Sequence, residues 1–317
     1  MKTQPLPLDR IGQRFSVRLH DPEGGYRDVV GHLKSANSVI NRSGDEISFD
    51  PEQIFIWREI LERPKMAGKG APLTLRVFEL DRICNATWPA TTNLEVDGWL
   101  MRVAGGVTNR ANSVLPLPNS LAATGEDEFA MKITQARNYY AGHGQPVIFQ
   151  LALPTWVELH ERLLSIGAIE TIRGNTMVAD LKPQQIDLPT GFELRQSSEL
   201  PEPWLAINPT VDIEKILTGC SATYLSISKA GQVVATARIA LAENWSSITR
   251  VYVIKEFRGQ GLAKLIVASA LQASLAQGAT KAVLQVDALN AIAIAVYEAL
   301  GFNFHHEYCY LELESAC

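Results

Sequence analysis

A glycine-rich segment near the C-terminal end carries the residues best suited to bind a ligand. It follows a β-branched stretch at residues 248–254, which is predicted to be a strand, and precedes an alanine- and leucine-rich helix predicted at 264–277. The first N–H groups of a helix have no partner within the helix, and that end is positive. Glycines also let a pyrophosphate approach the backbone, so the segment predicts an anion-binding loop. Its residues are Arg258, Gly259, Gln260, Gly261, Leu262 and Ala263.

Two common nucleotide-binding loops do not fit these residues. A Rossmann loop would need a third glycine where Lys264 stands, and the G-x-x-x-x-G-K-[ST] pattern of a P-loop is absent. A Gly-x-Gly alone is also typical of a tight turn that binds nothing. What the loop does therefore depends on the sequence that follows it.

Downstream, a second strand is predicted at 280–286 and a helix at 291–300, ending at Gly301. Asn290 precedes Tyr297 by seven residues. Because an α-helix has 3.6 residues per turn, the two lie about two turns apart near one face of the helix and its cap.

The arginine-glycine loop, followed by Asn290, Tyr297 and Gly301-Phe302, resembles the GNAT acetyltransferase superfamily. The resemblance implies a mixed sheet splayed between two parallel strands, with acetyl-CoA in the cleft. It implies that residues 258–263 hold the pyrophosphate, that Asn290 contacts the pantetheine arm, and that Tyr297 lies near the thioester sulfur.

The resemblance also implies that the pantetheine pairs with a strand edge formed by Val251, Tyr252 and Val253. The sequence departs from the family pattern at two positions. Lys255 stands where the strand usually ends in a proline, and Ala263 replaces a glycine of the loop.

Acetylation of an amine requires a neutral amine and a proton for the leaving thiolate. Tyr297 can donate that proton, although an aromatic packing role is the alternative. Glu243, just before the first strand, could act as the base through a water, but it also reads as an exposed loop carboxylate. Asp287 could be a base or a cap, and His305-His306 reads as a surface pair. No metal site is expected.

Acceptor recognition is predicted from arginines and an amide that could point into a cleft. The candidates are Arg102, Arg110, Asn112 and Arg238. Paired arginines suit a carboxylate-bearing substrate. The overall layout is also similar to single-chain actinobacterial acetyltransferases, some of them assigned as N-acetylglutamate synthases, so the α-amino group of L-glutamate is the leading expectation. A protein N-terminus, a lysine, an aminoglycoside or a non-enzymatic acyl-CoA sensor remain alternatives.

The chain is predicted to have an α/β (α+β) fold with three parts. Residues 1–62 show turn signals every 8–12 residues and suggest a small SH3-like β-barrel. Residues 73–182 resemble a degenerate GNAT-like domain with mixed, splayed sheets, whose loop at 117–125 lacks the glycine pattern. Residues 190–317 form the expected catalytic GNAT domain, and linkers are predicted at 62–72 and 182–191.

Composition sets the remaining expectations. The 317 residues include 29 basic and 34 acidic side chains, a net charge of −5 that argues against a nucleic-acid partner. The sequence has no long apolar run, so a cytoplasmic protein with a small-molecule amine substrate and no membrane partner is expected. The cysteines are far apart and are predicted to be reduced and buried: Cys84, Cys220, Cys309 and Cys317.

Overall fold

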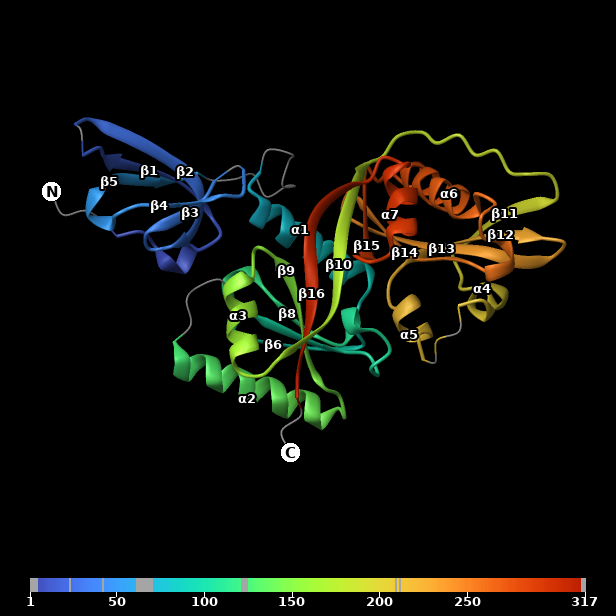
Figure 1. The fold of residues 1–317 in the computed structure, drawn as a ribbon, viewed down its shortest axis with the longest axis horizontal. Helices are drawn as coiled ribbons and strands as arrows, with labels where there is room; N and C mark the ends of the chain where they lie inside the picture. The colour runs from blue at the N-terminus through green and yellow to red at the C-terminus, as the bar shows by residue number, and fades with distance from the viewer. Residues whose placement is uncertain are drawn as a thin grey trace.

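The computed structural model describes residues 5–314 except residues 23, 42, 61–70, 121–124, 209 and 211. The linker predicted at 62–72 and the loop predicted at 117–125 therefore lie largely or partly outside the described residues. Figure 1 shows a small N-terminal sheet beside a longer body that is built on one continuous sheet.

The N-terminal sheet is antiparallel, with strand order β4-β3-β2-β1-β5. Alternating side chains of β1, namely Phe15, Val17 and Leu19, are fully buried in its core, as expected for a strand with one buried face. The pairings among the described residues do not join β4 to β5, so the expected barrel is observed as an open sheet. Its elements are η1 (Leu8–Arg10), β1 (Arg14–His20), β2 (Tyr26–Ser35), β3 (Ser38–Ile40), β4 (Glu46–Ser48), η2 (Pro51–Gln53) and β5 (Ile54–Glu59).

The longer body consists of two halves that are similar in element order. The first half contains α1 (Leu73–Thr87), β6 (Thr92–Val96), β7 (Trp99–Val103), η3 (Asn109–Ala111), β8 (Val114–Pro116), η4 (Pro118–Ser120), α2 (Glu126–Gly142), β9 (Val147–Leu153), α3 (Val157–Ser165) and β10 (Ile169–Asp180). The second half contains β11 (Phe192–Ser197), α4 (Glu202–Ala206), α5 (Glu214–Leu217), β12 (Ala222–Lys229), β13 (Gln232–Ala242), β14 (Trp245–Val253), η5 (Lys255–Phe257), α6 (Leu262–Ala276), β15 (Lys281–Asp287), α7 (Ala291–Glu298) and β16 (Asn303–Leu313).

The two halves exchange their last strands. The sheet runs β11-β12-β13-β14-β15-β10-β16-β9-β8-β7-β6. Strand β10 of the first half pairs with β15 of the second, and β16 of the second half pairs with β9 of the first. Figure 1 shows β10 and β16 side by side through the middle of the body. The boundary expected near 182–191 therefore separates two segments that share one sheet.

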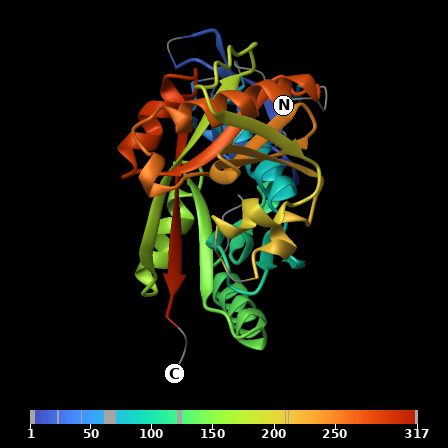
Figure 2. The same cartoon turned by 90° about the vertical axis from the view of Figure 1, so that its right-hand side faces the viewer.

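Helices cover both faces of the second half. Helix α6 packs on β12, β13 and β14, and its buried side chains belong to the same core cluster as Leu284 and Val286 of β15. Helix α1 packs on the other face of β13 and β14, where Leu80 and Ile83 meet Trp245 and Val283. The first half thus supplies a helix that covers the second half, as seen from the side in Figure 2.

We expect residues 190–317 expressed alone to remain unfolded. Without β9 and β10, strand β16 loses both of its neighbours and β15 is left with an unpaired edge. Far-UV circular dichroism and solubility would measure this, with co-expression of residues 71–182 as the rescue. A soluble, cooperatively folding 190–317 fragment would contradict the strand exchange.

Candidate active site

The site is organised by two parallel strands that pair over a short stretch and then diverge. Strands β14 and β15 pair at Trp245–Lys281, Ser246–Ala282 and Ser247–Val283. Beyond Ser247 no pairing between them is recorded, although β14 continues to Val253 and β15 to Asp287. The diverging ends leave backbone groups of both strands available to a ligand.

A β-bulge in β14 shapes one side of this opening. Arg250 has a left-handed φ of 54°, and the pairing with β13 shifts register there. The Nη2 atom of Arg250 donates hydrogen bonds to the carbonyl of Asn208, at 3.0 Å, and to the hydroxyl of Thr210, at 3.2 Å. The bulge was not predicted, because no glycine or asparagine marks the position in the sequence.

The predicted glycine loop lies at the end of β14, where the expected strand, loop and helix are confirmed. Gly259 and Gly261 both have φ of 77°, and Gly261 caps α6. The Nε atom of Arg258 donates to the carbonyl of Val253 at 3.0 Å, which ties the loop to the strand. Among the described residues, none accepts a hydrogen bond from the backbone N–H groups of residues 259–264.

The space over the loop is open. No atom would lie within 4 Å of a Cβ added to Gly259 or Gly261. Free N–H donors, a positive helix end and room for a ligand are the features that a pyrophosphate requires. The loop therefore fits a pyrophosphate group.

Asn290 and Tyr297 belong to α7, the helix that follows β15, as its N-cap and a residue of its last turn. Asn290 caps the helix, since its Oδ1 accepts the N–H of Ala293 at 3.1 Å, and the residue is exposed. Tyr297 is 9% exposed and packs edge-on against Phe302, with ring centroids 5.9 Å apart. Burial raises the pKa of Tyr297 to about 12, so its hydroxyl keeps its proton at neutral pH.

The structure does not support Glu243 as the base. Glu243 lies in the turn before β14 and forms an ion pair with Arg82 of α1. Strand β14 has nine residues, so at about 3.3 Å per residue its ends are roughly 26 Å apart, with Glu243 at the paired end and the loop at the other. Asp287 is exposed at the diverging end, where its Oδ1 accepts the N–H of Leu289 at 2.7 Å.

Three of the four residues predicted to recognise the acceptor have structural roles instead. Arg102 is 1% exposed and donates to Ser113, Gln150 and Asn85. Arg238 is fully buried and donates to the carbonyls of Leu217 and Thr87 and to the sulfur of Cys220. Asn112 is buried and holds the loop at 104–108 through hydrogen bonds to its backbone.

Arg110 differs from the other three. It is half-buried, its guanidinium lies 5.5 Å from the centroid of the Trp88 ring, and its Nε has no partner among the described residues. Arg110 and Asp287 both lie close enough to Tyr308 of β16 to interact with it electrostatically. Arg110 therefore remains a candidate for contact with the acceptor, on the face of the sheet that α1 covers.

The predicted surface pair His305-His306 is partly wrong. His306 is only 2% exposed, and its Nδ1 lies 2.7 Å from that of His305. Burial lowers the pKa of His306 to about 3 and that of His305 to about 4, with the nearby Arg76 acting in the same direction. Both imidazoles are thus neutral at physiological pH.

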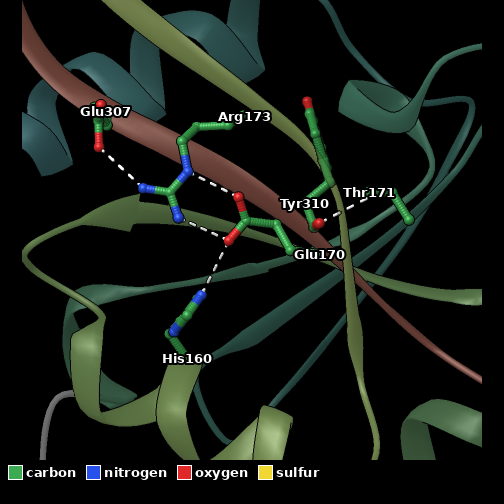
Figure 3. Close-up of polar contacts among 6 residues, drawn as sticks. All are labelled: His160, Glu170, Thr171, Arg173, Glu307 and Tyr310. Carbon is green, nitrogen blue, oxygen red and sulfur yellow. Dashed lines mark hydrogen bonds and ion pairs between the residues drawn. The ribbon is translucent and has the colours of Figure 1, made fainter. Parts of the chain in front are cut away.

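One group of side chains has the types that bind metals: His160, Glu170 and Cys309, whose ligand atoms lie within 4.8 Å of one another. Figure 3 shows Arg173 placed between Glu170 and Glu307. Both oxygens of Glu170 accept hydrogen bonds from Arg173, each at 2.7 Å, and burial raises the pKa of Cys309 to about 12. Because Arg173 occupies both oxygens of Glu170 and the Cys309 thiol stays protonated, these side chains favour an ion-pair network over a metal site.

Comparison with known proteins shows the family of the chain. A family model described as "Probable histone acetyltransferase Rv0428c C-terminal" matches residues 74–311, most of the chain. The chain belongs to this family of GNAT N-acetyltransferases. Membership implies the use of acetyl-CoA, in agreement with the open loop before α6.

Several relatives match most of their length. The chain is 24% identical, over 96% of both proteins, to the "Probable histone acetyltransferase Rv0428c" of Mycobacterium tuberculosis. It is 22% identical to the "Uncharacterized N-acetyltransferase YobR" of Bacillus subtilis, over 74% of this chain and 97% of that protein. A solved "Tandem GNAT protein from the clavulanic acid biosynthesis pathway" has the same fold, with a TM-score of 0.57 at 13% identity, covering 80% of this chain and 90% of that one.

These relatives do not support an N-acetylglutamate synthase assignment, and two of the arginines expected to clamp glutamate, Arg102 and Arg238, are engaged inside the protein. In the part of the chain that is described, no helix has the length and apolar character needed to cross a membrane.

We expect Gly261→Ala in this GNAT protein to weaken acetyl-CoA binding about tenfold, equivalent to about 1.4 kcal/mol. The added methyl group would occupy the open space over the loop and force a left-handed alanine, at about 1–2 kcal/mol. Gly278→Ala is the matched control, since Gly278 also has positive φ and open space but lies beyond the other end of α6. Isothermal titration calorimetry would measure both, and equal weakening in the two variants would contradict the assignment.

Arg238→Met should lower the free energy of unfolding by about 3 kcal/mol, because buried carbonyls lose a charged donor. Arg195→Met, which removes an exposed ion pair with Glu193, should cost no more than about 0.5 kcal/mol. Urea denaturation would measure the difference. A stable Arg238→Met variant with a raised KM for the acceptor would restore the substrate-binding hypothesis.

Proposed function

We propose that the protein is an acetyl-CoA-dependent N-acetyltransferase with one catalytic site, at the divergence of β14 and β15. The observation that carries the proposal is the combination of that divergence with unpaired N–H donors and open space at residues 259–264. When bound, acetyl-CoA supplies the activated thioester, and the protein supplies position, hydrogen bonds and protons.

Tyr297 is the proposed proton donor to the sulfur that leaves. Its raised pKa keeps the proton on the phenol oxygen at neutral pH, so the hydroxyl is present to donate to the sulfur as negative charge develops there. The edge of β14 that faces the divergence, at Val251, Tyr252 and Val253, is proposed to pair with the pantetheine, and Asn290 to contact the same arm at the start of α7.

The first half is proposed to be a GNAT-like copy that binds no CoA, in a tandem arrangement preceded by an SH3-like module. Its parallel strands, β8 and β9, correspond to β14 and β15. The helix that follows β8, however, begins with Glu126, Asp127 and Glu128, three carboxylates in the first turn. These carboxylates would repel a phosphate at the start of α2. The first turn of α6, by contrast, has no acidic residue.

An amine on a cationic molecule, such as the side chain of a lysine in a basic peptide, is the proposed acceptor in preference to glutamate. The net charge of −5 favours a positively charged partner, and the name of the M. tuberculosis relative points to the same class. Glutamate would need arginines that are free to bind its carboxylates, and Arg102 and Arg238 are not free.

A thiol-release assay with acetyl-CoA would test this proposal against a panel of a lysine-rich peptide, spermidine, an aminoglycoside and L-glutamate. Saturable turnover with the peptide or a polyamine supports the proposed acceptor class. Turnover confined to glutamate would overturn the proposed acceptor class but support the acetyltransferase activity. Binding of acetyl-CoA without turnover on any amine would favour an acyl-CoA sensor.

Tyr297→Phe should lower kcat about 100-fold and leave the Kd for acetyl-CoA nearly unchanged, because only the proton donor is removed. Steady-state kinetics and calorimetry would separate the two effects. Tyr139→Phe is the control, since the Tyr139 hydroxyl on α2 is buried without a partner among the described residues and lies in the first half. Parallel loss of affinity in Tyr297→Phe would make Tyr297 a packing residue.

A further inference from the structure

A cavity of about 100 Å³ lies where α1 meets the paired ends of β14 and β15. Its walls come from α1, β10, β14, β15 and the start of β16, so both halves of the body contribute to it. Trp245 and Lys281, which form the first β14–β15 pair, line the cavity, whereas the last pair, Ser247 and Val283, precedes the divergence. The cavity is therefore at the opposite end of this ladder from the proposed cofactor site.

Two cations on the walls of the cavity have no carboxylate partner among the described residues. Arg76 of α1 is half-buried, and no hydrogen bond or ion pair joins its guanidinium to a described residue. The ammonium of Lys281 lies 4.9 Å from the centroid of the Trp245 ring and forms no ion pair in the described part of the chain. Two such cations around one cavity favour a ligand with a carboxylate group.

A buried carboxylate lies on the same wall. Glu79, one turn along α1 from Arg76, is only 6% exposed, and its Oε1 accepts the indole N–H of Trp245 at 2.8 Å. Its other oxygen has no donor among the described residues and is not one of their fully enclosed polar atoms, so a ligand in the cavity can reach it. Asp180 adds a second carboxylate at the exposed end of β10. His305 adds no charge at neutral pH, because burial lowers its pKa to about 4.

The charges on the walls thus suit a ligand that carries both signs, and the volume limits its size. A cavity of about 150 Å³ binds benzene, so about 100 Å³ suits a molecule of roughly four to six non-hydrogen atoms. Glycine and alanine have this size, with a carboxylate and an ammonium group on the same carbon. Arg76 and Lys281 match the carboxylate, and Glu79 matches the ammonium. Leu80 and Val178 supply an apolar wall for a side chain no larger than a methyl group.

We propose that this cavity binds a small α-amino acid in its zwitterionic form, at a site separate from the divergence of β14 and β15. The site goes beyond the proposed acetyltransferase reaction and does not depend on it. A ligand that contacts Arg76 and Glu79 of α1 and Lys281 of β15 adds a link between the two halves, beside the strand pair that leads to the divergence.

The indole N–H of Trp245 reports on this site directly, because its hydrogen bond goes to Glu79 on the wall of the cavity. In the full-length protein labelled with nitrogen-15, titration with glycine should shift that indole signal saturably, with a Kd on the order of 1 mM. Trp245→Phe identifies the signal among those of the six tryptophans. If glycine produces no saturable shift at tens of millimolar, the proposal is wrong.

Arg76→Met should weaken glycine binding at least about tenfold, because the ligand carboxylate loses its guanidinium partner. The fold should be kept, since this guanidinium bonds to no described residue. Arg82→Met is the matched control on the same helix: Arg82 pairs with Glu243 and does not line the cavity, so its loss should leave the Kd for glycine unchanged. Equal weakening in the two variants would contradict the site.

Glu79→Gln separates an amino acid from a simple carboxylate as the ligand. The glutamine oxygen can still accept the indole N–H of Trp245, but the negative charge that binds the ammonium is removed. We expect the wild-type protein to bind glycine at least about tenfold more tightly than acetate or methylammonium, and Glu79→Gln to bind glycine no better than acetate.

Two results would overturn the amino-acid assignment. One is a wild-type protein that binds acetate or chloride as tightly as glycine. The other is displacement of glycine by saturating acetyl-CoA, which would place the bound glycine in the cofactor site. Both measurements use binding alone, so they stand whether or not the protein acetylates any amine.

Discussion

The architecture of the site depends on the point where β14 and β15 stop pairing. A parallel pair that continued beyond Ser247 and Val283 would satisfy its own backbone groups and leave nothing for a ligand. Because the strands diverge, the bulge at Arg250, the glycine loop and helix α7 all meet around unpaired backbone. The divergence is held by neighbours on both sides: β13 supports β14, and β10 supports β15.

Because the two halves exchange strands, the first half contributes directly to the sheet of the second. Strand β15 keeps its position because β10 lies beside it, and α1 covers one face of β13 and β14. The first half therefore supplies strands and a helix on which the second half depends. Buried arginines reinforce the junction, since Arg238 of β13 donates to the carbonyl of Thr87, at the end of α1. Such an arginine is needed for folding rather than for binding.

Local sequence patterns predicted the local features of the site. Positive φ at Gly259 and Gly261 and the helix that follows depend on residues close in sequence, and the structure has them where they were expected. The same holds for Asn290, whose cap of α7 is a short-range contact. In such cases residue type alone limits the backbone to few conformations.

Features that depend on distant contacts were not predictable in this way. Arg102 and Arg238 look like ligands for a carboxylate until tertiary packing brings carbonyls from other elements to them. Glu243 looks free until α1 places Arg82 beside it. His306 reads as a surface residue because the sequence does not reveal that β16 runs between strands of the other half.

The most direct test of the central claim is hydrogen–deuterium exchange of the full chain with and without acetyl-CoA. We expect acetyl-CoA to slow exchange of the amides of residues 259–264 and of the end of β14 at 251–253, and to leave the corresponding region of the first half, residues 114–130, unchanged. Binding of acetyl-CoA that protects the first half instead, or leaves residues 259–264 exchanging as before, would contradict that claim.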